Sequence, residues 1–180
     1  MDCLLTLAGA AVLDLADNDL IVANGNPVTI CTLIKSGRLI GKAANYSGPA
    51  AVLNDKGDGK TRIKDRFGGQ DVGPTDVLVK YTWNGDANLD GIVNADDYFQ
   101  IDSGYITQAK GWYNGDFNYD GIINADDYFL IDSAYIGQSG PLAASKPESA
   151  VSADVVMPQK TKKGQPDGIL SQLFSTGPVL

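Results

Sequence analysis

Two stretches of the chain share one pattern of acidic, amide and glycine residues. Residues 86–97 read DANLDGIVNADD, and residues 116–127 read DFNYDGIINADD. They lie in a duplication of period 30, in which residues 85–106 and 115–136 are identical at 17 of 22 positions. Repeats this similar fold alike and pack against each other with approximate two-fold symmetry. This duplication therefore decides the fold of the C-terminal half.

Each stretch has the spacing of a 12-residue calcium loop. Ca²⁺ takes roughly six to eight oxygen ligands, which such a loop supplies from positions 1, 3, 5, 7, 9 and 12, with glycine at position 6 for the sharp turn. Position 7 contributes its backbone carbonyl, so its side chain is free to be apolar. The sequence therefore predicts two Ca²⁺ ions, held by Asp86, Asn88, Asp90, Ile92, Asn94 and Asp97 in the first loop and by Asp116, Asn118, Asp120, Ile122, Asn124 and Asp127 in the second.

A single helix is expected after each loop. Tyr98, Ile101 and Tyr105 recur at i, i+3 and i+7, which predicts an amphipathic helix over residues 97–106, and the second copy repeats the spacing. The residues before the first loop are typical of a strand, so the expected unit is one loop plus one helix. The residue at position 8 of each loop is expected to pair with its counterpart as a short β-bridge. Position 12 is Asp in place of the usual Glu, so the helix must approach the ion more closely.

The first 83 residues are predicted to be rich in β-structure. Pro27 fits the first turn of a short helix and Gly37 fits its end. Apolar runs bounded by turn residues predict strands at residues 12–15, 19–22, 50–53 and 77–83. The turn from Asn54 to Gly59 superficially imitates a calcium loop, but Lys56 would stand at position 3, so we interpret it as a plain turn.

The expected fold class is mixed. A β-rich segment, residues 1–83, is interpreted as the end of a larger β domain, and a small α-helical pair of calcium loop–helix repeats follows at residues 84–137. Residues 138–180 are interpreted as a linker and disordered tail, because residues 138–168 are rich in Ser, Pro, Ala, Gly and Lys without periodicity.

Composition limits the classes of function. The net charge is −8, and the two loops hold eight Asp residues, so the acidity is concentrated where cations would bind. Such a chain repels nucleic acid and anionic membranes, and no apolar run is long enough for membrane insertion. The absence of His excludes His-based triads and zinc sites. Cys3 and Cys31 either form one disulfide in a secreted protein or are two buried thiols.

The two repeats resemble the type I dockerin domain, whose repeat reads D-x-N-x-D-G-x-[VI]-N-x-x-D followed by one helix. The resemblance covers about residues 84–137, under a third of the chain. The preceding segment is similar, more loosely, to the C-terminal region of large secreted planctomycete-type bacterial proteins with β-repeat stalks. The resemblance implies a non-catalytic module, extracellular or on the cell surface, that docks in a calcium-dependent way to a cohesin-like partner, often within a polysaccharide-degrading assembly.

The resemblance also implies which residues contact the partner. They are positions 10 and 11 of each repeat and two later helix positions, namely Ala95, Asp96, Asp102, Ser103, Ala125, Asp126, Asp132 and Ser133. The acidic residues depart from the Ser-Thr-like pair common in the family. The near-identity of the repeats implies two binding orientations related by a half-turn.

Other functions compete with docking. One is purely structural, with calcium stabilising the closure of a β-rich, adhesin-type surface protein that has no cohesin partner. An intracellular calcium sensor ranks last, because sensors generally expose a Met-rich groove, whereas Met1 and Met157 lie outside the repeats. An enzyme is not expected, because the conspicuous carboxylates are committed to the loops.

Overall fold

The computed structural model describes residues 5–42 and 44–142. These residues belong to one compact unit that spans residues 1–149. Cys3 and most of the predicted tail lie outside the described residues. The elements are β1 (Leu13–Asp14), β2 (Leu20–Val22), α1 (Pro27–Lys35), β3 (Leu39–Ile40), β4 (Ser47–Leu53), β5 (Arg66–Phe67), β6 (Gln70–Asp71), β7 (Val77–Trp83), α2 (Ala95–Thr107), the 3₁₀ turn η1 (Trp112–Asn114) and α3 (Ala125–Gly137).

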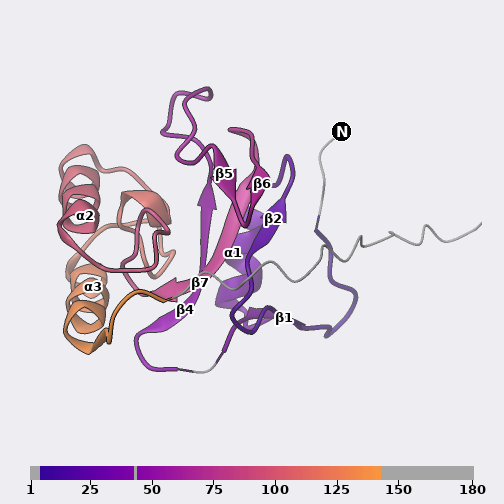
Figure 1. Cartoon of the computed structure of the whole chain (residues 1–180), viewed down its shortest axis with the longest axis horizontal. Coiled ribbons are helices and arrows are strands. Elements are labelled where there is room, and N and C mark those ends of the chain that lie inside the picture. The colour runs from indigo at the N-terminus through magenta and orange to yellow at the C-terminus, as the bar shows by residue number, and fades with distance from the viewer. Residues whose placement is uncertain (1–4, 43, 143–180) are drawn as a thin grey trace, which may run out of the picture. The chain divides into compact units, whose positions relative to one another are not determined.

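A three-stranded antiparallel sheet with strand order β2-β7-β4 lies at the centre of the N-terminal half (Figure 1). Every residue of β7 is buried, because both faces of this strand are covered. Val77 and Val79 pack with Ile30 and Leu33 of α1 on one face. Leu78, which points the other way, belongs to a second core that includes residues of the acidic repeats. A strand buried on both faces reads as a continuous apolar run, which is why β7 was predictable.

The predicted helix and the predicted strands are present. Pro27 is the first residue of α1, and the Asn26 side chain caps it by accepting the N–H groups of Val28 and Thr29 at 2.9 and 3.4 Å. Gly37, just beyond the helix, has a φ of +66°, which is the left-handed conformation that ends many helices. Two further strand pairs are present, β1–β3 and β5–β6. The apolar pattern predicted β1 but not the short strands β3, β5 and β6.

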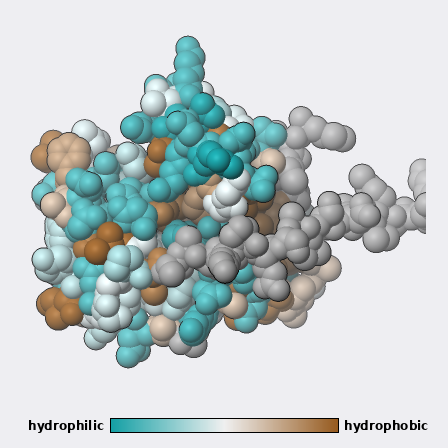
Figure 2. Space-filling view, in the orientation of Figure 1, coloured by the Kyte–Doolittle hydropathy of each residue, from teal (hydrophilic) through white to brown (hydrophobic). Residues whose placement is uncertain are grey.

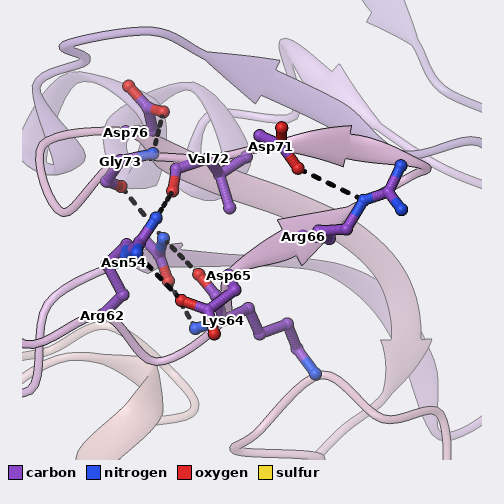
Figure 3. A network of polar contacts seen from close by, with 9 residues as sticks. All are labelled: Asn54, Arg62, Lys64, Asp65, Arg66, Asp71, Val72, Gly73 and Asp76. Atoms are coloured by element: carbon purple, nitrogen blue, oxygen red, sulfur yellow. Dashed lines mark hydrogen bonds and ion pairs between the residues drawn. The ribbon is translucent and has the colours of Figure 1, made fainter.

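Asn54, immediately after β4, is wholly buried. Its side chain donates to the carbonyls of Lys64 and Gly73 at 2.9 Å each, and accepts the Lys64 N–H at 2.8 Å. Figure 3 shows these bonds tying the chain on either side of the β5–β6 hairpin to the end of β4. The predicted turn therefore begins with a residue that serves a structural role in the core.

The two helices of the duplication, α2 and α3, lie beside each other at the left of Figure 1. Tyr98 of α2 donates its hydroxyl hydrogen to Asp132 of α3 at 2.6 Å, and Tyr128 of α3 donates to Asp102 of α2 at the same distance. These crossed bonds relate the two repeats by approximate two-fold symmetry, as duplication predicts. Across the described residues, no helix is both long and apolar enough to cross a bilayer.

One hydrophobic core joins the sheet to the repeats. Val52 and Leu78 of the sheet belong to the same buried cluster as Ile101 and Ile131 of the repeats and Trp112, which lies between the repeats. In the first five residues of the predicted tail, the Leu142 N–H donates to Gly91 O at 2.8 Å and Gly140 O accepts the Trp83 indole N–H at 3.2 Å. The repeats are thus packed on both the segment before them and the segment after them.

Candidate metal centre

The first acidic loop, residues 86–97, is closed by its last residue. Asp97 lies in the first turn of α2 and has no exposed surface. Its Oδ1 accepts the Ala87 N–H at 2.9 Å, and its Oδ2 accepts the Asn94 N–H at 2.9 Å. The carboxylate therefore ties the end of the loop back to its beginning, which is the closure that position 12 of a calcium loop requires.

Asp86, the first residue of this loop, is also fully buried. Its Oδ1 accepts the Asp90 N–H at 3.0 Å, and its Oδ2 accepts the Gly91 N–H at 2.8 Å and a hydrogen bond from the Thr82 hydroxyl. The Trp112 indole N–H donates to the Asp86 carbonyl at 2.7 Å, so a residue just before the second repeat helps to hold the first loop. Positions 1 and 12 therefore meet in the interior of the protein.

The second loop, residues 116–127, repeats this arrangement. Asp127 Oδ1 accepts the Phe117 N–H at 2.8 Å, and its Oδ2 accepts the Asn124 N–H at 3.0 Å. Asp116 is 3% exposed, and its Oδ1 is buried without a hydrogen-bond partner within the described part of the chain. A buried carboxylate oxygen left in this state costs about 1–3 kcal/mol or more.

The residues at positions 3 and 5 turn back on their own backbone. Asn88 Oδ1 accepts the Asp90 N–H at 2.8 Å, and Asp90 Oδ1 accepts the Ile92 N–H at 3.0 Å. The equivalent bonds of Asn118, Asp120 and Ile122 measure 2.7 and 2.8 Å. Asp90 and Asp120 are exposed. Across residues 5–42 and 44–142, no group of three or more Asp, Glu, Cys or His side chains is arranged to hold a metal ion.

Positions 7 and 9 have separate tasks. Ile122 exposes 64% of its surface, so its side chain is free of the core, whereas Ile92 is half-buried. Asn94 and Asn124 cap α2 and α3, with each Oδ1 accepting the N–H two residues on at 2.7 Å. Each cap forms a reciprocal capping box with the position-12 Asp. The same residues that start the helices therefore shape the loops.

Burial raises the pKa of the carboxyl groups that close the loops. The pKa of Asp86 is raised to about 6 and that of Asp97 to about 7, in both cases chiefly by burial, with neighbouring carboxylates adding to the effect. The pKa of Asp127 is raised for the same main reason. Negative charge is thus costly here in the absence of a cation, and a bound cation would relieve this cost.

The donor set fits a hard cation. The twelve predicted ligands offer carboxylate, amide and backbone oxygens, which are the ligands that Ca²⁺ prefers. The buried Asp116 Oδ1, which has no partner among the described residues, is an atom that such an ion would satisfy. The structure brings positions 1 and 12 of each loop together and leaves position 5 on the surface.

The residues that the resemblance assigns to partner binding divide into three groups. Ala95, Asp96, Ala125 and Asp126 are exposed in the first turns of the helices, and Ser103 and Ser133 are half-buried. Asp102 and Asp132 are exposed, but each accepts a tyrosine hydroxyl from the facing helix. These two carboxylates therefore hold the helix pair together.

The expected β-bridge between the position-8 residues is replaced by a side chain. The Val93 N–H donates to Gln138 Oε1 at 2.8 Å, and the Val93 carbonyl accepts a hydrogen bond from Gln138 Nε2 at 2.7 Å. The primary amide of Gln138 thus takes the place that the Ile123 backbone was predicted to fill. Gln138, Trp112 and Thr82 lie outside the loop motif, so the motif did not indicate them.

A cavity of about 500 Å³ lies beside the second loop, lined by α1, β4 and residues around η1. Cys31, Trp112 and Tyr119 are among its lining residues. Cys31 has a free thiol, and burial raises its pKa to about 11, so it is a weak nucleophile at neutral pH. The cavity therefore has no reactive thiol at Cys31.

The chain was compared with protein-family models, with curated proteins and with solved structures, and no match was found.

Proposed function

We propose that residues 84–137 form a calcium-binding docking module of an extracellular or cell-surface protein. Each loop holds one Ca²⁺, and α2 and α3 present the docking surface to a cohesin-like partner, in a cell-surface or polysaccharide-degrading assembly. The module is non-catalytic. The resemblance of both repeats to the type I dockerin domain supports this class of partner.

The observation that carries the calcium proposal is the environment of Asp116. This residue is 3% exposed, and its Oδ1 has no partner among the residues described. Proteins seldom bury a carboxylate oxygen in this way unless an ion or water completes it. The first loop supports the same interpretation, because Asp86 and Asp97 are fully buried with raised pKa values.

The surface of the helix pair supports docking. Phe99, Ile106, Phe129 and Ile136 are between 67% and 84% exposed, and they are equivalent pairs in the duplication. Figure 2 shows hydrophobic patches on the side of the molecule where α2 and α3 lie. Exposed apolar side chains mark interaction surfaces where they gather in a contiguous patch. Because each repeat supplies the same pair, a partner could bind in two orientations.

Calcium titration of the full chain by calorimetry tests the metal part of this proposal. Two ions are expected to bind, and Asp86→Asn with Asp97→Asn should remove one of them. Asp116→Asn with Asp127→Asn should remove the other. The matched control, Asp55→Asn with Asp58→Asn, neutralises two carboxylates outside the loops and should leave both ions bound. A wild-type chain that takes up no calcium would refute the proposal.

A pull-down with a cohesin-type domain tests the docking part. The wild-type chain should be retained in calcium and lost in chelator. Phe99→Ser with Phe129→Ser should abolish retention while both ions remain bound. Retention that is equal in calcium and in chelator would contradict calcium-dependent docking.

A structural role in closing the β-rich segment is the second candidate function, and one contact favours it. Tyr119, at position 4 of the second loop, accepts the Ala51 N–H on its hydroxyl oxygen at 2.7 Å. The Lys35 ammonium donates to the Tyr119 carbonyl at 2.8 Å. A cation in the second loop would therefore stabilise β4 and α1 through Tyr119.

The reactivity of Cys31 with a thiol reagent tests this second function. In a Cys3→Ser background, calcium should slow the labelling of Cys31, because α1 opens less often. Tyr119→Phe should weaken this protection without removing either ion. If calcium leaves the labelling rate unchanged, the metal does not stabilise the N-terminal segment.

A further inference from the structure

We propose that Thr82 is a positioning residue for the first calcium site, holding the Asp86 carboxylate in the orientation in which it takes the ion. Thr82 lies on β7, four residues before the loop begins, and is not part of the loop motif. This inference rests on the proposed calcium function.

The geometry around Asp86 assigns different tasks to its two oxygens. Oδ2 accepts the Thr82 hydroxyl hydrogen and the Gly91 N–H at 2.8 Å, so it is held from the strand on one side and from the loop on the other. Oδ1 accepts the Asp90 N–H at 3.0 Å, and Asp90 belongs to the loop itself. A change in the loop conformation can therefore free Oδ1 to bind an ion, while Oδ2 remains hydrogen-bonded to Thr82.

The burial of Thr82 needs a polar explanation. Thr82 has no exposed surface, and all seven residues of β7 are buried. Valine has nearly the same shape and the same preference for strands, and it would avoid burying a hydroxyl. A buried hydroxyl is retained where it has an acceptor, and the acceptor here is the carboxylate at position 1 of the loop.

The second loop reaches the same arrangement by different means. Asp116 Oδ2 accepts the Gly121 N–H and the Gly111 N–H, each at 3.2 Å. Gly121 is the counterpart of Gly91, so the backbone N–H of Gly111 replaces the Thr82 hydroxyl. In both loops, Oδ2 of the first Asp accepts one hydrogen bond from inside the loop and one from outside it. This agreement indicates that the outer donor is needed at this position.

Outer partners of metal ligands fix the orientation of the ligand, and losing one typically lowers metal affinity by about 10–100-fold. Thr82→Val should therefore weaken calcium binding at the first loop by about this factor. Binding at the second loop should not change, because Asp116 is held by backbone groups.

The test uses the full chain with Asp116→Asn and Asp127→Asn, the pair expected to remove the second ion, which leaves the first loop as the calcium site to be titrated. In this reference chain, calorimetry should give one ion, and Thr82→Val should weaken its binding at least tenfold. Thr82→Ser keeps the hydroxyl and should bind within about threefold of the reference. Thr107→Val is the matched control, because it removes an exposed hydroxyl that bonds to the Ser103 carbonyl. It should have no effect.

Equal affinity of the Thr82→Val and reference chains would overturn the positioning role while leaving the calcium function intact. If the reference and wild-type chains both bind no calcium, the proposed function and this inference fail together. If Thr82→Val does not fold by circular dichroism, Thr82→Cys replaces it, because a thiol is a much weaker donor. Its affinity must then fall while Thr82→Ser retains it, and equal affinity of these two variants would refute the inference.

Discussion

Gly115 lies against Ile101 so closely that a Cβ added to the glycine would stand 2.6 Å from the Ile101 Cα. The duplicated pair repeats this contact, because a Cβ on Gly85 would stand 2.7 Å from the Ile131 Cβ. Each helix therefore packs its central isoleucine on the glycine that precedes the loop of the other repeat. These reciprocal contacts set the distance between the repeats.

Replacing either glycine by alanine should destabilise the protein. Overpacking costs about 1–3 kcal/mol, and the φ of +107° at Gly115 adds about 1–2 kcal/mol for a residue with a Cβ. Gly37→Ala is the control, because Gly37 has a φ of +66° but open space around it, so it should lose the conformational part alone. Denaturant unfolding measures the difference. Equal losses at Gly115 and Gly37 would refute the close contact.

The stability of the metal-free chain should fall as the pH rises. The pKa values of Asp86 and Asp97 increase from 3.8 to about 6 and about 7 in the folded protein. A folded state that binds protons more tightly than the unfolded chain is stabilised below pH 3.8 and loses this stabilisation as the pH rises towards 7. Thermal unfolding in metal-free buffer should therefore show a midpoint lower at pH 7.5 than at pH 5 by roughly 5 °C or more.

Calcium should reverse this trend, because the ion binds the deprotonated carboxylates. At saturating calcium the midpoint should be higher at pH 7.5 than at pH 5. Asp97→Asn should reduce the dependence on pH in metal-free buffer, because the carboxyl group whose pKa is raised further no longer titrates. A metal-free midpoint that rises over this range would contradict the raised pKa values.

Asp116→Asn should separate stability from binding. The neutral amide costs less to bury than the carboxylate, so the metal-free variant should be more stable by about 1–2 kcal/mol. The same variant should gain less stability from calcium, because the second loop loses a charged ligand. Urea unfolding with calcium and with chelator measures both effects. A variant less stable than the wild type in chelator would show that the carboxylate is satisfied without a metal.

Tyr98→Phe and Tyr128→Phe should each loosen the contact between the two helices. Each removes one hydrogen bond of 2.6 Å to an exposed carboxylate, so each should cost about 0.5–1.5 kcal/mol. The two losses should be similar, because duplication makes the contacts equivalent. If Asp102 and Asp132 serve the helix pair, both variants should retain calcium and unfold earlier in denaturant. An unchanged unfolding midpoint would count against this role.

Local signals in the sequence account for much of the fold. Pro27 and Gly37 bracket a helix with the expected start and end, and the apolar run of β7 forms the central strand. The helices begin at Ala95 and Ala125, two residues earlier than the hydrophobic spacing predicted, because the capping asparagines start them. The loop motif also singled out the carboxylates of positions 1 and 12, and the structure buries them in the interior.

The contacts that the sequence did not reveal join residues far apart in the chain. Tyr119 binds Ala51, and Gln138 binds Val93, with no pattern to pair them. The spacing of Tyr105 predicted a buried face, yet its side chain is 58% exposed. A close approach of the backbone explains why the repeats diverge at Gly104. There a Cβ would stand 1.9 Å from the Asn114 carbonyl oxygen, whereas the equivalent Ala134 is fully buried without such an obstacle in the described structure.

The two ends of the repeat region meet at the first loop. β7 ends three residues before Asp86. The returning chain bonds through Gly140 to Trp83 and through Leu142 to Gly91. Tension applied to the chain on either side would therefore load these bonds before it reached α2 or α3. An ion between Asp86 and Asp97 would then raise the force needed to unfold the module, in addition to stabilising it in the absence of tension.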